Sequence, residues 1–187
     1  MPLTRAELYE KANELKHLEC LPDAYVGWLP KGKTKDGIQK WVPYISYEAT
    51  LGIFDYYFGV HYSLVMTPYP TCIQCAVSVI DADGMVLMKH ADLSDIKLDK
   101  AKPKDDPTKP KDEKEEYEFA DSDASAASRA FPRVARYYST AIADLWGIGT
   151  KVQVSCPSDY GKPTKAISWE YLVKMYNTKG TAFLHLK

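Results

Sequence analysis

Apolar side chains recur along the chain with two periods, one typical of helices and one typical of strands. In residues 4–19, apolar residues at helical spacing follow a Thr and a Glu that can form a capping box, which predicts an amphipathic helix. A second helix is predicted over residues 48–59, because its apolar residues share one face and Gly59 can end it. Strands are predicted over residues 38–45, 61–69, 71–81 and 84–93, with a hairpin turn at Asp83-Gly84 between the last two.

The second half of the chain begins with an Ala-rich pattern. Residues 122–146 predict one long helix, in which Pro132 marks either the start or a kink, since proline removes an amide donor. Gly147 and Gly149 are stop signals. A strand over residues 151–155, a helix over 168–176 and a strand over 181–186 are predicted to follow. Residues 27–37, rich in Gly, Lys and Pro, are predicted to form an exposed loop.

The composition suits one domain that spans residues 1–187. The chain is 45% apolar and 26% charged, enough for a substantial core. One stretch departs from this average, since residues 97–116 contain seven Lys, seven acidic residues and three Pro. Such a stretch cannot bury enough apolar surface to offset its ordering entropy. We therefore expect a flexible charged insertion at residues 97–118.

Charge and hydropathy narrow the classes of function. The formal net charge of −1 gives no global field that would draw the protein to nucleic acid or to an anionic membrane, so any such site must be local. No apolar run has the length of a membrane span, and the N-terminus lacks the apolar core of a secretory signal. Four scattered cysteines agree with a reducing compartment. We expect a cytoplasmic protein with no membrane partner.

Residues 27–34 match the phosphate-loop pattern, in which a Gly, four residues and Gly-Lys-Thr are followed by a helix. In such a site Lys33 would reach the terminal phosphates, Thr34 would bind Mg²⁺, and Asp81 would support the metal. The chemistry requires a helix that starts at Lys33-Thr34, whereas Asp36-Gly37 and a strand pattern follow. We therefore keep a small ATPase only as an alternative.

The cysteines and histidines predict no metal centre or catalytic group. Cys72 and Cys75 have the spacing of half a zinc site, but strand alternation places them on opposite faces. The four His residues show no ligand or nucleophile pattern. We expect buried structural cysteines, no catalytic residue, no metal and no cofactor.

Three arginines form the most informative constellation. Arg129, Arg133 and Arg136 fall on one stripe of the expected long helix, and no carboxylate lies between Ala124 and Ala143. Guanidinium groups spaced in this way suit a phosphate backbone, and an exposed arginine face with structural aromatics is the alternative. The predicted Gly/Lys loop and the strand that follows it add cations and aromatic rings that could contact a polynucleotide. The additional candidates are Lys33, Lys35, Lys40, Trp41 and Tyr44.

The order of several motifs resembles the annealing domain of the Rad-fifty-two family of single-strand annealing recombinases, which includes phage Sak-type members. The matching segments, in order, are an N-terminal helix, residues 21–26 (LPDAYV), residues 39–45 (QKWVPYI), a helix ending Phe58-Gly59, residues 75–80 (CAVSVI) closed by Asp83-Gly84, and a helix with Arg129-Ala130. The resemblance covers residues 5 to about 147. It implies an α+β fold in which a twisted antiparallel β-sheet packs against a long helix.

The same resemblance implies how DNA would be held. Family members form multimeric rings and hold single-stranded DNA by its backbone in a basic groove, with bases free to pair and no requirement for ATP. Arg129 matches the inner DNA site directly, whereas the next basic position falls on Pro132, beside Arg133. The family's second site has a basic residue where this chain has Glu48 and Ala49. In this chain, Lys33, Lys35 or Lys40 would have to replace the basic residue of that second site.

We therefore expect a homo-oligomeric protein, a ring or filament, that anneals single-stranded DNA in recombination or repair without ATP. A single-strand-binding protein or a nuclease is an expected partner, and a phage or bacterial source fits the short chain. Residues 150–187 have no counterpart in the family, and we expect them to form an extension for subunit contacts. The alternatives are the small ATPase and a protein-interaction module whose basic face binds an acidic protein.

Overall fold

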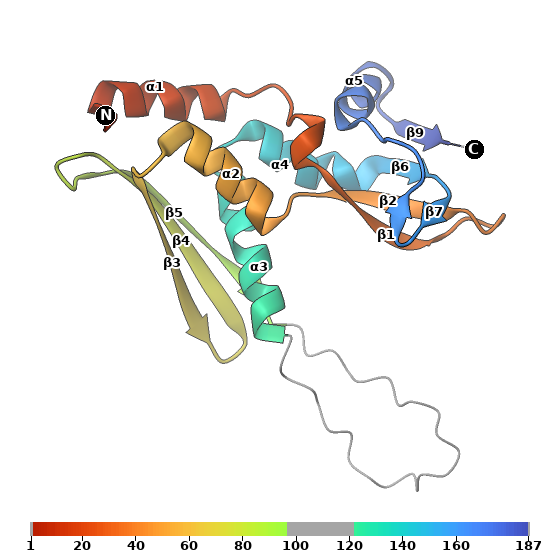
Figure 1. Cartoon of the computed structure of the whole chain (residues 1–187), viewed down its shortest axis with the longest axis horizontal. Helices are drawn as coiled ribbons and strands as arrows, with labels where there is room; N and C mark the ends of the chain where they lie inside the picture. Colours follow the sequence, from red (N-terminus) through yellow and green to blue (C-terminus); the bar gives the residue numbers. More distant parts are fainter. Residues whose placement is uncertain (1, 97–121, 187) are drawn as a thin grey trace, which may run out of the picture.

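The computed structural model describes residues 2–96 and 122–186 (Figure 1). The expected charged insertion at residues 97–118 lies outside the described residues. The elements in chain order are α1 (Arg5–Lys16), η1 (Asp23–Tyr25), β1 (Gly27–Lys33), β2 (Gln39–Tyr44), α2 (Tyr47–Phe58), β3 (Tyr62–Tyr69), β4 (Cys72–Ile80), β5 (Val86–Asp95), α3 (Ser122–Ala135), α4 (Thr140–Gly147), η2 (Gly149–Lys151), β6 (Val152–Ser155), β7 (Ser158–Asp159), β8 (Lys162–Pro163), α5 (Trp169–Lys179) and β9 (Ala182–His185).

The first sheet is an antiparallel meander of β3, β4 and β5, with β4 in the centre. Every second residue of β4, from Ile73 to Val79, is buried, while the residues between them are half-buried. This alternation gives the sheet one covered face, because successive side chains of a strand point to opposite sides. α3 packs against β4 and β5 on the covered face.

The second sheet has the order β1-β2-β6-β9 and draws on both ends of the chain. The β1–β2 and β2–β6 pairs are antiparallel, whereas β6 and β9 are parallel. A parallel pair needs a crossover, and α5 lies in the connection between these two strands (Figure 1). Residues 150–187, expected as an extension, thus supply two strands to the sheet that contains the β1–β2 hairpin.

The α+β class, with antiparallel sheets packed against helices, is confirmed. The long helix is wrong in its extent. α3 continues through Pro132, ends at Ala135, and is followed after a turn by α4, which is capped by the side chain of Ser139. The turn brings the Tyr138 hydroxyl to donate a buried hydrogen bond of 2.7 Å to the carbonyl of Val77 in β4. Pro132 is therefore not the start of the helix, and the division comes three residues after α3 has passed through it.

The loop expected over residues 27–37 is instead a β-hairpin. Residues Gly27–Lys33 form β1, which pairs with β2, and only the segment around Asp36-Gly37 is a turn. β1 lies at the edge of its sheet, where Pro30 is tolerated because its missing amide does not interrupt a ladder on both sides. The Gly and Pro content that suggested a loop is thus accommodated by an edge strand.

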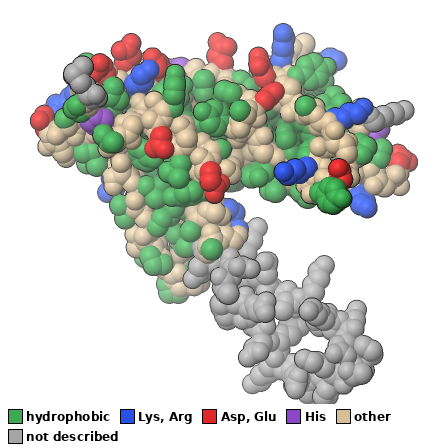
Figure 2. Space-filling model, viewed as in Figure 1, with side chains coloured by type: hydrophobic (Ala, Val, Ile, Leu, Met, Phe, Trp, Pro, Cys, Tyr) green, Lys and Arg blue, Asp and Glu red, His purple; other side chains and the backbone are tan. Residues whose placement is uncertain are grey.

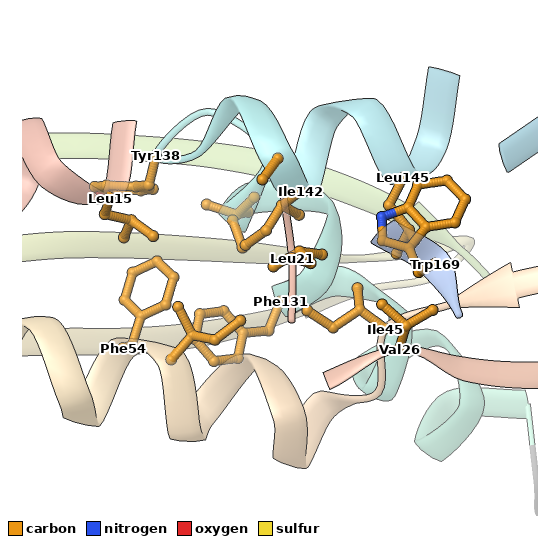
Figure 3. Close-up of a cluster of buried hydrophobic side chains, with 14 of the residues drawn as sticks. Leu15, Leu21, Val26, Ile45, Phe54, Phe131, Tyr138, Ile142, Leu145 and Trp169 are labelled. Atoms are coloured by element: carbon orange, nitrogen blue, oxygen red, sulfur yellow. The ribbon is translucent and has the colours of Figure 1, made fainter. Parts of the chain in front are cut away.

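Aromatic and aliphatic side chains from the helices form the core between the elements (Figure 3). The ring of Phe131 in α3 lies 5.1 Å from that of Phe54 and 5.5 Å from that of Tyr47, both in α2, in edge-on contacts. Such pairs add to the stabilisation from burial alone. α2 is thereby fixed across α3, with its first turn beside the β1–β2 hairpin (Figure 1).

Within residues 2–96 and 122–186, no helix combines the length and the apolar character that a bilayer span requires.

Candidate nucleic-acid interface

A groove of about 680 Å³ lies between the β1–β2 hairpin and α3. The first turn of α2 and the segment from α4 to β6 complete its lining. The residues that line it are Leu29, Lys31, Val42, Pro43, Tyr44, Ile45, Ser46, Tyr47, Glu48, Ser125, Ser128, Arg129, Pro132, Leu145, Trp146, Gly149, Thr150 and Val152. Two residues of the sequence-based set, Arg129 and Tyr44, therefore come together here from segments 85 positions apart.

Arg129 is held in place by its neighbours. One terminal nitrogen of the guanidinium donates to the Ser125 hydroxyl one turn earlier in α3, and the other donates to the Asp95 carbonyl at 3.0 Å. Both partners are uncharged groups, so the positive charge of Arg129 is oriented without being neutralised by them. The side chain is only half-buried and lines the groove, where an anion can reach it.

The lysines of the hairpin differ in position. Lys31 is exposed and lines the groove from β1. Lys33 and Lys35 are exposed at the far end of the hairpin, beyond the groove lining. Lys40 is half-buried in β2 opposite Ser155 of β6. Strand alternation places Lys40 on the same side of β2 as the groove residues Val42 and Tyr44.

Tyr44 lies across the backbone of β1. Its Cα pairs with that of Gly27, and a Cβ added at Gly27 would meet Cε1 of the Tyr44 ring at only 2.3 Å. Glycine at position 27 thus lets the ring settle against the strand while its other surface stays 36% exposed. This contact fixes the position of the Tyr44 ring in the lining of the groove.

Glu48 is the one carboxylate among the residues that line the groove. Its own backbone amide and the Ser46 hydroxyl lower the pKa of its carboxyl group, so it stays ionised. Where the family resemblance implies a basic residue, this groove therefore carries a negative charge. The sequence-based substitutes Lys33 and Lys35 are not among the residues that line the groove beside it.

Arg136 is paired with Asp92, whereas Arg133 lies near the same carboxylate and its Nε has no hydrogen-bond partner among the described residues. The Arg136 guanidinium donates to the Asp92 carboxylate of β5 at 2.8 Å, and Nε of Arg133 lies 4.0 Å from the same oxygen. Asp92 and the Tyr137 hydroxyl both raise the pKa of Arg136, with the Tyr137 bond the larger cause. Arg129 and Arg133 lie in α3, whereas Arg136 follows its last residue. Of the three arginines, only Arg129 lines the groove. The expectation that all three share one stripe of a single helix is therefore wrong.

Trp41 is wrong as a stacking candidate. Its side chain is only 1% exposed, and its indole N–H donates a 2.9 Å hydrogen bond to the Cys156 carbonyl. Trp41 therefore fixes β2 against the C-terminal part of the sheet. Its ring has no free face to offer a base.

The phosphate-loop pattern does not form a phosphate loop. Gly27 to Lys33 is extended in β1, and Thr34 closes the hairpin through hydrogen bonds with Ile38 in both directions. No helix begins at Lys33-Thr34, so this segment lacks the backbone N–H groups of a helix N-terminus that would bind a phosphate. Asp81 instead forms an ion pair of 2.6 Å with Arg5 at the start of α1, and this end of α1 lies at the opposite end of the molecule from the β1–β2 hairpin (Figure 1).

Cys75 and Cys156 are buried as expected, whereas Cys20 and Cys72 are only half-buried. Cys75 is buried and Cys72 is half-buried on the other face of β4, and all four cysteines are free thiols. Among the described residues no group of three or more His, Cys, Asp or Glu side chains is arranged to hold a metal ion.

Sequence reasoning missed Lys31 and Trp146 as residues of the groove. Trp146 is 41% exposed at the end of α4, next to the stop signal Gly147. The sequence signal that could have identified Trp146 is its place directly after Leu145 of the apolar stripe, since neighbouring residues of a helix point about 100° apart. The lysine could not be distinguished from its neighbours without the hairpin register.

Charge is unevenly distributed over the face of the molecule that Figure 2 shows. On the face in Figure 2, Lys and Arg side chains are more frequent over the end with the hairpin and α5 than over the β3–β4–β5 sheet, which is mainly hydrophobic and uncharged.

Comparisons of the chain with protein-family models, with curated proteins and with solved structures each returned no match. The functional assignment therefore depends on the geometry of the groove.

Proposed function

We propose that the protein binds single-stranded DNA in the groove between the β1–β2 hairpin and α3 and anneals complementary strands without ATP. The observation that carries this proposal is the convergence of Arg129, Lys31 and Tyr44 on one groove from separate elements. The groove carries two cations and an aromatic ring against the one carboxylate of Glu48. The cations suit the charged phosphates of a single strand, and the ring suits its unpaired bases. The order of motifs that resembles the Rad-fifty-two family supports the same function.

Annealing needs no covalent chemistry from the protein. Lys31 and Arg129 neutralise phosphates of one strand, which lowers its repulsion towards a complementary strand. Base pairing between the two strands then provides the free energy of the reaction. In this proposal no residue is catalytic and no nucleotide cofactor takes part.

Assembly of several copies is the second part of the proposal. By strand register, the outer face of the first sheet carries Val65, Tyr69 and Leu93, each more than 40% exposed. Thr67 and Gln74 lie between these apolar residues on the same face. Exposed apolar residues grouped on one face of a sheet are typical of an interaction surface, and a second copy of the chain is the proposed partner. A ring or filament would place many grooves along one strand and multiply their affinity.

The test is binding of a fluorescein-labelled single-stranded oligonucleotide across salt concentrations of about 50 to 200 mM. We expect affinity to fall steeply with salt. The double variant Arg129→Ala, Lys31→Ala should lower the slope of log affinity against log salt by about 1.4, at about 0.7 for each lost phosphate contact. Lys174→Ala removes the same type of charge from exposed α5, outside the groove, and should leave the slope unchanged.

The second measurement is annealing of complementary oligonucleotides that carry a fluorophore and a quencher, with no nucleotide present. The wild type should accelerate annealing over the spontaneous rate, and the double variant should lose most of that acceleration. A protein that neither binds the oligonucleotide nor shows salt dependence would contradict the proposal and favour the protein-interaction module. Solution mass by light scattering tests the assembly separately.

A further inference from the structure

We infer that the groove takes unpaired nucleobases between Tyr44 and Trp146 in addition to contacting the phosphate backbone. This inference rests on the proposed function and adds to it a way of holding the strand. The resemblance implies a strand held by its backbone with every base turned outward. The lining of this groove calls for a different arrangement.

Most of the groove wall is apolar. Leu29, Val42 and Pro132 line it together with the rings of Tyr44 and Trp146. A channel that contacts only phosphates gains nothing from an apolar wall, because ionised phosphates are stabilised by cations, hydrogen-bond donors and water. Nucleobases have large apolar faces, and these are the part of a single strand that such a wall can bury.

The two exposed rings are supplied by different walls. Tyr44 comes from β2, its ring lies against Gly27 of β1, and the residue remains 36% exposed in the lining of the groove. Trp146 comes from the last turn of α4 and is 41% exposed. Neither ring has an aromatic partner in the described part of the chain. Both can therefore stack on a base without first breaking an existing ring contact.

The polar residues of the groove can bind the sugar and phosphate of a stacked nucleotide. Arg129 and Lys31 supply positive charge, while Ser125, Ser128 and Thr150 supply hydroxyl groups in the same lining. The volume of about 680 Å³ falls within the range of about 300 to 1,000 Å³ that is typical of sites for small organic molecules. A mainly apolar pocket with a few polar groups is the usual composition of such a site.

This arrangement selects single strands over duplex. In a duplex each base is already stacked on its neighbours and paired, so its faces are not available to Tyr44 or Trp146. Stacking is tolerant of sequence because every base has a π-face. The groove should therefore prefer any unpaired strand that carries bases, whatever its sequence.

The experiment compares two ligands that have the same phosphates, a 20-mer of thymidine and a 20-mer of abasic sites, each with one fluorescein. The wild type should bind the thymidine strand about 5-fold or more tightly than the abasic strand. Tyr44→Ala and Trp146→Ala should each weaken binding of the thymidine strand about 5-fold, and the double variant should bind both strands alike. The salt slope should stay at the wild-type value, because no charge is removed.

Two further variants separate stacking from folding. Gly27→Ala keeps every side chain of the groove but displaces the Tyr44 ring, and it should reproduce the loss seen with Tyr44→Ala. Tyr160→Ala removes a ring that is 99% exposed and outside the groove, and it should change nothing. Circular dichroism confirms that each variant is folded.

The outcomes are distinguishable from those that test the proposed function. Steep salt dependence with equal affinity for the thymidine and abasic strands would overturn the stacking inference and leave single-strand binding intact. An absence of binding to either strand would overturn both. Preference for the base-bearing strand that disappears in the Tyr44 and Trp146 variants supports the inference.

Discussion

The Asp92 carboxylate lies beside two arginines, Arg133 and Arg136. We expect removal of its charge to strengthen the proposed binding of DNA and to lower the stability of the fold. The carboxylate accepts a hydrogen bond from Arg136 at 2.8 Å and lies 4.0 Å from Nε of Arg133. Both arginine side chains are about one-third exposed. Asp92→Asn keeps the size of the side chain but removes the charge that holds both guanidinium groups at β5.

The magnitude follows from the number of cations released. Each additional phosphate contact on a single strand changes the slope of log affinity against log salt by about −0.7. At 0.1 M salt this corresponds to an affinity that is higher by about 5-fold. Two released arginines therefore correspond to a gain of up to about 25-fold and a salt slope steeper by up to about 1.4. Because the ion pair is partly exposed, its loss should lower the free energy of unfolding by only about 1 kcal/mol.

The assay is anisotropy of a labelled single-stranded oligonucleotide over a series of salt concentrations, together with urea denaturation. Asp95→Asn is the matched control, since Asp95 lies on the same strand and no arginine pairs with its carboxylate among the ion pairs of the described residues. A general effect of net charge would appear in both variants. If Asp92→Asn leaves affinity and slope at the wild-type values, Arg133 and Arg136 serve the fold alone and the reasoning is refuted.

Three further outcomes test the fold. Phe131→Ala should lower the free energy of unfolding in urea by about 3 to 5 kcal/mol, because the ring is fully buried, and a loss below about 1 kcal/mol would contradict this packing. The Met85 amide, and after it Arg5, hold the pKa of the Asp81 carboxyl below its usual value. The stability that Asp81 contributes is therefore present above its ordinary pKa and is lost as pH falls through the folded pKa. Asp81→Asn should flatten the acid limb of a stability-against-pH curve, and an unchanged limb would argue against the ion pair. Burial raises the pKa of the Cys75 thiol to about 12, so iodoacetamide at pH near 8 should label Cys75 only after unfolding, as followed by peptide mass spectrometry.

Local signals in the sequence were sufficient to predict helices with a recognisable start or end and strands joined by a short turn. The capping box at Thr4 and Glu7 starts α1, and Gly59, with a φ of 55°, ends α2, both as expected. The strands around the Asp83-Gly84 turn were predicted because their alternation and turn residues lie close together in sequence. β1 was missed because an edge strand tolerates the Gly and Pro that usually indicate a loop.

The candidate site depended more on contacts between distant segments. Arg129 and Tyr44 were identified from residue type and pattern, and both line the groove. The burial of Trp41 depends on a carbonyl 115 residues later, and the pairing of Arg136 depends on a carboxylate 44 residues earlier. Periodicity within one element cannot reveal such partners, because either face of a strand or helix can become the covered one.

The pairing of β2 with β6 also determines when the groove can form. Trp41 of β2 pairs with Val154 of β6, and β6 is in turn bordered by β9 near the end of the described chain. Contacts of such high sequence separation form late, since a long loop must close before they contribute. During synthesis, the wall that carries Lys31 and Tyr44 therefore stays incomplete until β9 has left the ribosome and paired with β6. If the proposed function holds, the nascent protein should bind polynucleotides only after this pairing has formed.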